Sequence, residues 1–359
     1  MTSHATPDLA EFTLADLETW VVDAGLPRYR AHQIFRWVWK KGATSFEDMS
    51  DLGRGLRSSL SGRLAFTTPA VARDETSADG TRKLVLRLAD RRHIECVYIP
   101  DTPAQTFCVS TQVGCAMGCA FCLTGKMGLA RHLTAGEIAG QVRVLARATG
   151  LAGQPFNIVL MGMGEPLHNY AATMAALALL NEREGMALPP RRVTLSTVGL
   201  VPMLEKLAGE PLIPNLAISL HATTDDQRAA IVPPTRKYGL QAILDACRRF
   251  PVGARNRITF EYVLLQGVND EPADARRLVR LLHGIRAKVN LIPLNAAPGI
   301  PFDRPSEARV DAFARILAER GMTVSVRKSR GRDIRAACGQ LIVSDGPARS
   351  AGQALAAAL

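Results

Sequence analysis

The stretch GCAMGCAFCLTGKMG, residues 114–128, contains three cysteines in a C-x3-C-x2-C spacing. Cys115, Cys119 and Cys122 offer three thiolates from one short loop and leave a fourth ligand position unfilled. A structural zinc site has four protein ligands, and an ordinary 4Fe-4S electron carrier uses four cysteines. We therefore predict a 4Fe-4S cluster with one open iron. A zinc knuckle or three unrelated thiols are the alternatives, and Cys108 is a candidate fourth ligand.

The loop resembles the cysteine signature of the radical SAM superfamily, and the aromatic Phe121 before the last cysteine fits that pattern. The resemblance implies that S-adenosylmethionine (SAM) binds the open iron through its amino and carboxylate groups. It also implies that an electron from the cluster cleaves SAM to a 5'-deoxyadenosyl radical. We therefore expect one 4Fe-4S cluster and SAM as the cofactors.

Strand-like and helical segments alternate from residue 104 onward, with helical stretches such as 134–149 and 306–320. This alternation predicts an α/β fold in which helices wrap a parallel sheet. Thr134 and Glu137 form a predicted capping box at the start of the helix after the cysteine loop. About six strands favour a partial (β/α)6 TIM-type barrel. The strand-like segments are FCVST (107–111), FNIVLMG (156–162), RVTLST (192–197), NLAISLH (215–221), ITFEYVLL (258–265), KVNLIPL (288–294) and TVSVRK (323–328).

The chain upstream of the barrel divides into two predicted parts. Residues 12–62 show helical spacing of apolar side chains, and residues 69–100 contain strand-like segments around the turn ADG at 78–80, as in a hairpin-like connector. The predicted domains are a helical RNA-binding accessory domain (1–66), a β connector (67–103), the barrel (104–345) and a flexible tail (346–359). We expect Phe35, Trp37 and Trp39 in the module's core rather than stacked on bases. Its predicted outer face carries Arg28, Arg30, Arg36, Lys40 and Lys41.

The composition indicates an enzyme that binds a polyanion. With 359 residues, of which 47% are hydrophobic, the chain can bury a large core. Its net charge of +11 points to a polyanionic partner such as a nucleic acid, and a generic basic surface is the alternative. No segment approaches the ~20 apolar residues of a membrane span, and the N-terminus lacks a signal sequence. We therefore expect a cytoplasmic protein with no membrane contact, whose seven cysteines are not a disulfide framework.

Polar residues and glycines gather where the predicted strands end, which in such barrels is where the chemistry occurs. Gly162 and Gly164 allow the backbone to approach a ligand closely, and Glu165 can accept hydrogen bonds from an ammonium group. A tight turn is the alternative for this GMGEP segment, and a core position is the alternative for His221. Together the strand ends predict a cofactor pocket formed by Gly162, Met163, Gly164, Glu165, Ser196, Thr197, Ser219, His221 and Asn295.

Seven motifs give the chain a close resemblance to the RlmN and Cfr group of radical SAM RNA methyltransferases, most closely its RlmN branch. The resemblance extends from about residue 12 to residue 343. The motifs are IECVYIP (94–100), FCVSTQVGCAMGCAFC (107–122), MGMGEPL (161–167), VTLSTVG (193–199), LAISLHA (216–222), VNLIPLN (289–295) and RKSRGRDIRAACGQL (327–341).

The resemblance implies a role for each matching residue. Cys338 is the cysteine that becomes methylated, Cys108 is the second catalytic cysteine, and Glu95 is the acid-base residue. We expect the glycine-bearing, basic segment around Cys338 to be a mobile loop, and Cys96 and Cys247 to be buried bystanders. The implied cluster ligands are Cys115, Cys119 and Cys122, and the implied SAM site is Gly164, Glu165, Ser196, Ser219, Leu220, His221 and Asn295.

The implied mechanism uses two SAM molecules per turnover and two cysteines. One SAM methylates Cys338, and the radical from the second activates the S-methyl group for addition to an adenine carbon. The Cys108 thiolate then attacks the Cys338 sulfur, which forms a disulfide and releases methyladenosine. Cys108 is therefore better interpreted as catalytic than as a cluster ligand.

The expected reaction is methylation of adenosine carbon 2 in 23S ribosomal RNA, and in transfer RNA for some members. The alternatives are methylation of carbon 8, as in the Cfr branch, and a non-catalytic iron-sulfur RNA-binding protein. We also expect a monomer that receives electrons from a flavodoxin or ferredoxin.

Overall fold

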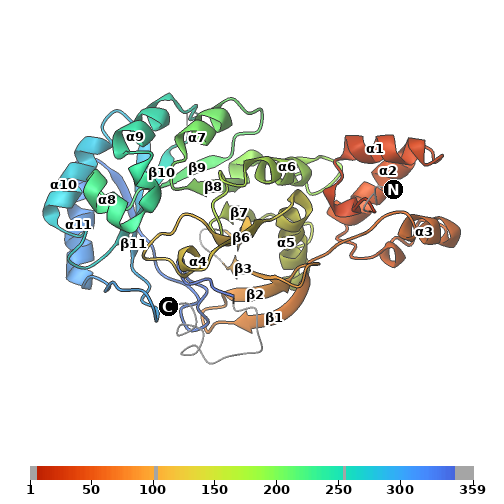
Figure 1. Cartoon of the computed structure of the whole chain (residues 1–359), viewed down its shortest axis with the longest axis horizontal. Helices are drawn as coiled ribbons and strands as arrows, with labels where there is room; N and C mark the ends of the chain where they lie inside the picture. Colours follow the sequence, from red (N-terminus) through yellow and green to blue (C-terminus); the bar gives the residue numbers. More distant parts are fainter. Residues whose placement is uncertain (1–5, 101–103, 254–255, 344–359) are drawn as a thin grey trace.

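The computed structural model describes residues 6–100, 104–253 and 256–343, so the predicted tail lies outside the described residues. A small helical module stands at one end of the molecule, beside a larger body of sheet and helices (Figure 1). No helix among the described residues has the length and apolar character needed to cross a membrane.

The helical module has the predicted elements. Its helices are α1 (Leu14–Asp23), α2 (Tyr29–Trp39) and α3 (Arg54–Ser61), with 3-10 turns η1 (Leu9–Glu11) and η2 (Phe46–Asp48). Phe35 and Trp39 are buried as predicted. Trp37 is only partly buried: its indole N–H donates to Asp51 at 2.5 Å, and the Lys41 ammonium lies 3.6 Å from its ring centre.

One sheet of ten strands forms the body, in the order β1-β2-β3-β4-β7-β8-β9-β10-β11-β12. The pairs from β1 to β4 are antiparallel, and those from β4 to β12 are parallel. The strands are β1 (Ala70–Thr76), β2 (Arg82–Arg87), β3 (His93–Ile99), β4 (Thr106–Cys108), β7 (Asn157–Leu160), β8 (Val193–Thr197), β9 (Asn215–Ser219), β10 (Ile258–Leu264), β11 (Ala287–Pro293) and β12 (Thr323–Val326).

This sheet confirms the predicted partial barrel and extends it at both edges. The edge strand β12 is a seventh parallel strand, one more than the six expected. The predicted β connector continues the barrel sheet over its described residues 67–100, because β3 pairs with β4 through Val97 and Cys108. The acid-base candidate Glu95 on β3 is thereby fixed next to the strand that ends in Cys108.

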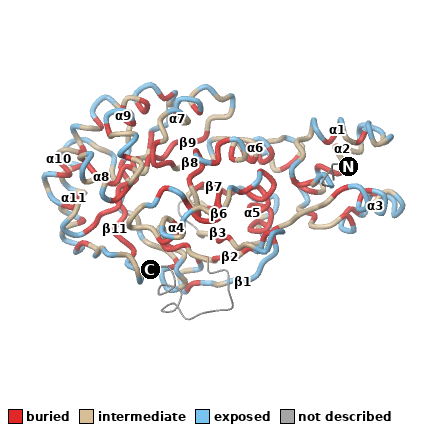
Figure 2. The backbone as a smooth tube through the Cα atoms, in the orientation of Figure 1, coloured by how far each residue is buried: buried red, intermediate tan, exposed pale blue. Residues whose placement is uncertain are grey.

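Helices cover the outer face of the sheet (Figure 1). Figure 2 shows that α5 is almost entirely buried, because it lies between the sheet and the module. The predicted capping box of Thr134 and Glu137 opens it. The helices and turns are α4 (Leu123–Lys126), α5 (Ala135–Ala148), α6 (Tyr170–Asn181), η3 (Pro190–Arg192), α7 (Val201–Ala208), α8 (Asp225–Ile231), η4 (Pro233–Arg236), α9 (Leu240–Arg249), α10 (Pro272–Leu281) and α11 (Glu307–Glu319).

A separate two-stranded ribbon holds the two ends of the cysteine loop together. It pairs β5 (Gln112–Cys115) with β6 (Gly128–His132). Gly114 has φ +77°, and a Cβ at this position would lie 1.9 Å from the Gly128 carbonyl oxygen. Only glycine fits there, so the residue before the first cysteine fixes the start of the loop.

Candidate functional site

A cavity of about 160 Å³ lies at the C-terminal ends of the parallel strands, where the sequence places the cofactor pocket. Met163 and Leu220, which were also expected there, are fully buried and do not line it. Predicted residues that do line it are Cys115, Cys119, Cys122, Gly162, Gly164, Glu165, Ser196, Thr197, Ser219, His221 and Asn295.

The three thiols of the cysteine loop meet at this cavity. Burial raises the pKa of Cys115, Cys119 and Cys122, and the negative charges of neighbouring thiolates raise it further. Three such thiols ionise readily only beside a strong positive charge, which a metal centre supplies. No three His, Cys, Asp or Glu side chains within the described ranges could hold a single metal ion. A cluster suits them better, because each thiolate then binds a different iron.

Glu165 is held in place by backbone hydrogen bonds. Its carboxylate accepts from the N–H groups of Leu167 at 3.0 Å and Val198 at 2.9 Å. Burial outweighs these hydrogen bonds and raises the pKa of Glu165 to about 7. Gly164 has φ +106°, and a Cβ there would lie 2.7 Å from the Gln112 Cβ. The glycine therefore lets the carboxylate approach the cavity, where it can accept from a ligand ammonium.

His221 is a neutral hydrogen-bond donor in this pocket. Burial lowers its pKa to about 3. Its Nδ1 accepts from the Val263 N–H at 3.0 Å, so the proton is on Nε2. The backbone has φ +63°, rare for a residue with a side chain, and Asn269 supports it by donating to the His221 carbonyl oxygen at 2.6 Å. The predicted cofactor contact is therefore geometrically possible.

Arg228 is a fully buried residue that sequence reasoning missed. Its guanidinium donates to the Val198 carbonyl oxygen at 2.6 Å and to those of Ser219 and Leu220 at 2.9 Å. It thereby joins the C-terminal ends of β8 and β9. In the sequence DDQRAAI this arginine looks like an ordinary surface residue of a helix, and no local pattern could have identified it.

A second cavity of about 750 Å³ opens at the opposite, N-terminal ends of the strands. The first or second residues of six strands line it, including Asn157 of β7 and Asn215 of β9. Its charged side chains are Arg191, Arg192, Lys288, Arg327, Lys328, Arg330 and a single carboxylate, Glu261. Residues that line both cavities are Met161, Glu261, Asn295, Arg327 and Cys338. Cys338 therefore lies where the two cavities meet.

The segment carrying Cys338 was expected to be a mobile loop, but the structure holds it by several hydrogen bonds. The Leu123 N–H donates to the Gly339 carbonyl oxygen at 2.8 Å, and the Thr124 hydroxyl donates to that of Leu341 at 2.6 Å. Both donors begin α4, immediately after the last cluster cysteine. This arrangement keeps Cys338 beside the cysteine loop.

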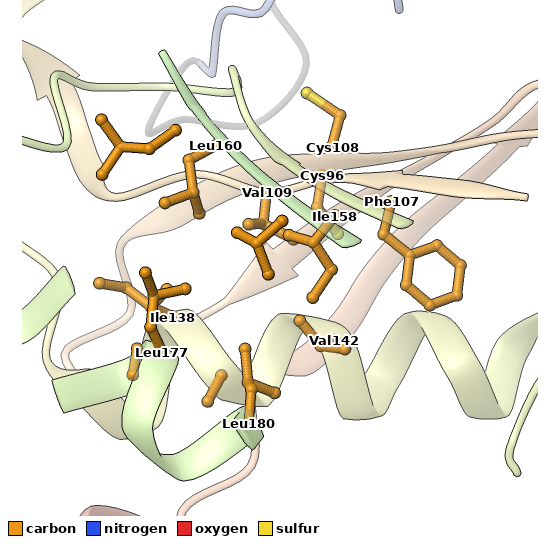
Figure 3. Packing of buried hydrophobic residues seen from close by; sticks show 14 of the residues in the cluster. Cys96, Phe107, Cys108, Val109, Ile138, Val142, Ile158, Leu160, Leu177 and Leu180 are labelled. Atoms are coloured by element: carbon orange, nitrogen blue, oxygen red, sulfur yellow. The ribbon is translucent and has the colours of Figure 1, made fainter. Parts of the chain in front are cut away.

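Cys108 lies at the end of β4 and lines neither cavity, with 5% of its surface exposed. Its sulfur points away from Ile138 and Val142, to the other side of the strand from the Phe107 ring (Figure 3). Burial and the negative charge of the Cys338 thiolate raise the pKa of Cys108 to about 12, and the Arg327 guanidinium opposes this rise. The two catalytic candidates therefore lie close enough to interact electrostatically.

Glu95 lines neither cavity. It accepts from the Lys83 ammonium at 3.1 Å and from the Ile342 N–H at 2.9 Å. Burial raises the pKa of its carboxyl, although Lys83 opposes this effect. In this structure Glu95 thus holds the chain just beyond Cys338. Cys96 and Cys247 are buried, as expected for bystanders.

Two protein families match separate parts of the chain. The radical SAM superfamily matches residues 109–279. The ribosomal RNA large subunit methyltransferase N-terminal domain matches residues 7–65. The first match contains the cysteine loop and most of the cofactor pocket, and the second covers the helical module.

Several curated proteins and a solved structure are similar over almost the whole chain. The dual-specificity RNA methyltransferase RlmN of Syntrophobacter fumaroxidans is 48% identical, covering 94% of this chain and 98% of that protein. The protein of the same name from Anaeromyxobacter dehalogenans is 49% identical, and the match covers 98% of this chain and 96% of that protein. The crystal structure of a radical SAM methyltransferase from Sphaerobacter thermophilus has a TM-score of 0.90 at 49% identity. The match covers 93% of this chain and 99% of that one.

Proposed function

The chain belongs to the RlmN family of dual-specificity RNA methyltransferases, and we propose that it methylates carbon 2 of an adenosine in 23S ribosomal RNA and in transfer RNA. The observation that carries this proposal is the position of Cys338, where the cofactor pocket meets the larger basic cavity. A sulfur at this junction can receive a methyl group from one side and present it to a nucleotide on the other.

The three loop cysteines and the strand ends suit the family's cofactors. Cys115, Cys119 and Cys122 would hold a 4Fe-4S cluster, while Glu165 would accept from the SAM ammonium and His221 would donate from Nε2. When bound, the cluster and SAM supply radical chemistry at a methyl carbon. The residues of this chain bind and orient them and exclude water from the pocket.

The larger cavity suits entry of the target adenosine. Its volume of about 750 Å³ is sufficient for a nucleotide. Its cations, among them Lys288, Lys328 and Arg330, favour a phosphate-bearing ligand. We propose that the adenine enters from the N-terminal ends of the strands and reaches the Cys338 sulfur from below the cofactor pocket.

Product release requires a second thiol next to Cys338. We propose that the Cys108 thiolate attacks the Cys338 sulfur, which breaks the bond between that sulfur and the methylene carbon on adenine. The Cys338 thioether and the Cys108 thiolate become one disulfide, and the electron pair of the broken bond stays with the methylene carbon, which takes up a proton from solvent to become the product methyl group. Arg327 faces both cysteines, and its guanidinium opposes the rise in the pKa of Cys108. A flavodoxin or ferredoxin would supply electrons, and we place the enzyme in the cytoplasm as a monomer.

The test is a product assay on RNA treated with the reconstituted protein, SAM and a reductant. We expect nucleosides from the digested RNA to contain material that coelutes with authentic 2-methyladenosine. Material coeluting only with 8-methyladenosine would assign the reaction to carbon 8. Absence of both products, with an intact cluster, would favour a non-catalytic RNA-binding protein.

A further inference from the structure

A cleft of about 760 Å³ separates the helical module from the N-terminal side of the barrel. We call it the basal cleft. The module contributes residues 37–43, and the barrel contributes the end of α5 and the loops at 150–156 and 183–192. Figure 1 shows the module beside α5 and α6. The charged side chains that line the cleft are Lys40, Lys41, Arg143, Arg147, Arg183, Arg192 and Asp48.

Most of the cations of the cleft have no carboxylate partner among the described residues; the exception is Lys41, whose ammonium lies 3.7 Å from the Asp51 carboxylate. Arg147, Arg183 and Arg192 make no ion pair with any residue that the structure describes. The single carboxylate, Asp48, already accepts from the backbone N–H groups of Thr44 at 2.7 Å and Ser45 at 3.1 Å. Six cations thus face one carboxylate that is occupied locally.

Arg143 is an unusual member of this set because it is buried, with 3% of its surface exposed. Its Nη2 donates to the Thr68 hydroxyl at 2.6 Å, but Nε and Nη1 have no hydrogen-bond partner among the described residues. A buried charge without a counter-ion is unfavourable. The negative charge of an anion in the cleft would attract the Arg143 guanidinium and offset part of this cost.

The described aromatic side chains that line the basal cleft offer a base little accessible ring surface, and one of them, Phe156, is buried. The ring of Trp37 is covered by the Lys41 ammonium, and Trp39 is buried with the Arg143 guanidinium 5.2 Å from its ring centre. Base stacking requires an accessible ring. The cleft is therefore suited to phosphate groups rather than to bases.

Arg192 lies between this cleft and the larger cavity of about 750 Å³ at the N-terminal ends of the strands, because it lines both. Its Nη1 donates weakly, at 3.4 Å, to the Phe156 carbonyl oxygen and the Asn157 side chain. A chain of phosphates that leaves the cavity beside Arg192 would next meet Arg183 and Arg147. The two cavities therefore adjoin at Arg192 on the N-terminal side of the barrel, and basic side chains line both.

We propose that the basal cleft binds the sugar-phosphate backbone of the substrate RNA at nucleotides flanking the target adenosine. The proposal rests on the proposed RNA methylation and adds a second binding site to it. Phosphate contacts position a nucleic acid without reading its sequence. Such contacts suit an enzyme that acts on two RNAs, because both share a backbone.

The outer face of the module, where the sequence places the RNA contacts, is less suited to this role. Arg28 pairs with Glu18 at 2.5 Å, and Arg36 pairs with Glu184 at 2.5 Å. Of the five basic residues predicted there, Lys40 and Lys41 line the basal cleft. The strongest anion site therefore lies between the module and the barrel.

The experiment measures RNA affinity of the reconstituted full chain over a salt series. The cleft variant is Arg147→Gln with Arg183→Gln, and the probe is a labelled 23S ribosomal RNA fragment or unmodified transfer RNA. We expect affinity at low salt to fall roughly tenfold. The slope of log affinity against log salt should flatten by roughly 0.7–0.9 for each phosphate that the variant no longer binds, and the KM for RNA should rise more than kcat falls. The charge-preserving pair Arg147→Lys with Arg183→Lys should restore most of the slope.

The matched control is Arg276→Gln with Arg280→Gln, two exposed arginines on α10 at the far end of the molecule. Cluster content and thermal unfolding of all variants confirm folding. Wild-type affinity and slope in the cleft variant, or an equal loss in the control, would overturn the proposal. If the wild type makes no methyladenosine but the cleft variant still binds RNA more weakly, the basal cleft stands and the proposed methylation fails. If the wild type methylates RNA and the cleft variant binds normally, only the cleft proposal fails.

Discussion

Cys108 shows how a buried thiol can act late in a reaction. In the resting protein its sulfur lies at the end of β4 and its pKa is raised to about 12, so the neutral thiol predominates. We propose that it ionises beside Arg327 when Cys338 carries the nucleotide. Cys108→Ala should therefore allow attack on the RNA but block its release. Denaturing electrophoresis should then reveal protein covalently joined to labelled RNA, at about the stoichiometry of active sites.

The control for this experiment is Cys247→Ala, which replaces a buried cysteine on α9 that lines neither cavity. It should turn over without accumulating the covalent species. Normal turnover by Cys108→Ala would make Cys108 a bystander. Loss of the cluster from that variant would instead favour a ligand role for this thiol.

We propose an acid-base role for Glu95 beside its observed structural contact, and a single substitution can separate the two. As a carboxylate it can take up a proton, and as an acceptor it holds the Ile342 N–H at 2.9 Å. Glu95→Gln keeps an acceptor oxygen but removes the base. We expect methylation of Cys338 to continue while RNA product formation falls by roughly 100-fold or more, the usual scale of general acid-base catalysis. Mass spectrometry of the protein and chromatography of the RNA measure these two quantities.

The two outcomes that contradict this view of Glu95 differ from each other. Full product formation by Glu95→Gln would show that no proton transfer depends on this carboxylate. If Glu95→Gln also loses methylation of Cys338, the main role of Glu95 would be to hold the segment around Ile342 in place. Glu75→Gln is the matched control. Glu75 also pairs with Lys83 at 3.1 Å, but it lies on β1, two strands away from Glu95 on β3.

Site residues that belong to short sequence motifs could be predicted, whereas residues that act through contacts between distant segments could not. The cysteine spacing and the strand-end motifs identified most of the cofactor pocket, because the ends of parallel strands meet at one edge of a sheet. Arg228 and Arg327 act through contacts with strands distant in the sequence, and no spacing pattern encodes such contacts. Leu220 lies within a matching motif but its side chain is fully buried, so its assignment to the SAM site stays a prediction that only its backbone could fulfil.

At the scale of elements, the hairpin of β1 and β2 supports the segment that leads to Cys338. The side chain of Asp79 in the turn accepts from the Gly331 N–H at 3.0 Å, and the Asp333 carboxylate accepts from the Ser77 hydroxyl at 2.6 Å. Alternating strand patterns predicted a hairpin but could not reveal its partner. Its partner in the sheet is β3, which in turn pairs with the barrel strand β4, and its turn contacts the Cys338 segment.

This anchor should make the stability of the segment depend on pH. Burial alone would raise the pKa of Asp79, but hydrogen bonds from Thr81 and Gly331 lower it from 3.8 to about 2. A depressed pKa contributes stability above pH 3.8, and that contribution is lost as the pH falls towards 2. Allowing for solvent screening, we expect Asp79→Asn to cost about 1 kcal/mol at pH 6 and progressively less at lower pH.

Hydrogen exchange at the Gly331 amide measures this effect directly. The exposed Asp311→Asn on α11 is the control and should leave that amide's protection unchanged. An Asp79→Asn protein whose Gly331 amide is equally protected at pH 6 would show that the anchor contributes nothing. A difference from wild type that grows as the pH falls would have the wrong sign for a depressed pKa.

At the scale of the whole molecule, α5 is the element that fixes the module against the barrel. Its first turn receives the side chain of Glu11 from η1: the Glu11 carboxylate accepts from the Thr134 hydroxyl and from the Gly136 N–H at 3.0 Å. A carboxylate at a helix N-terminus is favourable for the helix dipole. The same helix ends at the basal cleft with Arg143 and Arg147, so its position sets the width of the proposed RNA path.

Gly136 makes this junction testable with one methyl group. In an ordinary helix, replacing glycine with alanine stabilises the protein by roughly 0.5–1 kcal/mol. Here a Cβ would lie 2.5 Å from the Glu11 carboxylate and 2.8 Å from the Ala10 carbonyl oxygen. Gly136→Ala must therefore displace η1, and we expect it to lower the free energy of unfolding by about 1–3 kcal/mol. Chemical denaturation at neutral pH measures this change.

The matched control is Gly55→Ala in α3, where an added Cβ meets no atom within 4 Å and the usual stabilising sign should appear. If the Glu11 contact is responsible, Gly136→Ala should cost less in a Glu11→Ala background, although the clash with the Ala10 carbonyl oxygen would remain. A Gly136→Ala protein as stable as Gly55→Ala would mean that η1 yields without cost. In that case the contact between η1 and α5 would not be what fixes the module against the barrel. Another contact would then have to hold the two walls of the basal cleft at the distance that a phosphate chain requires.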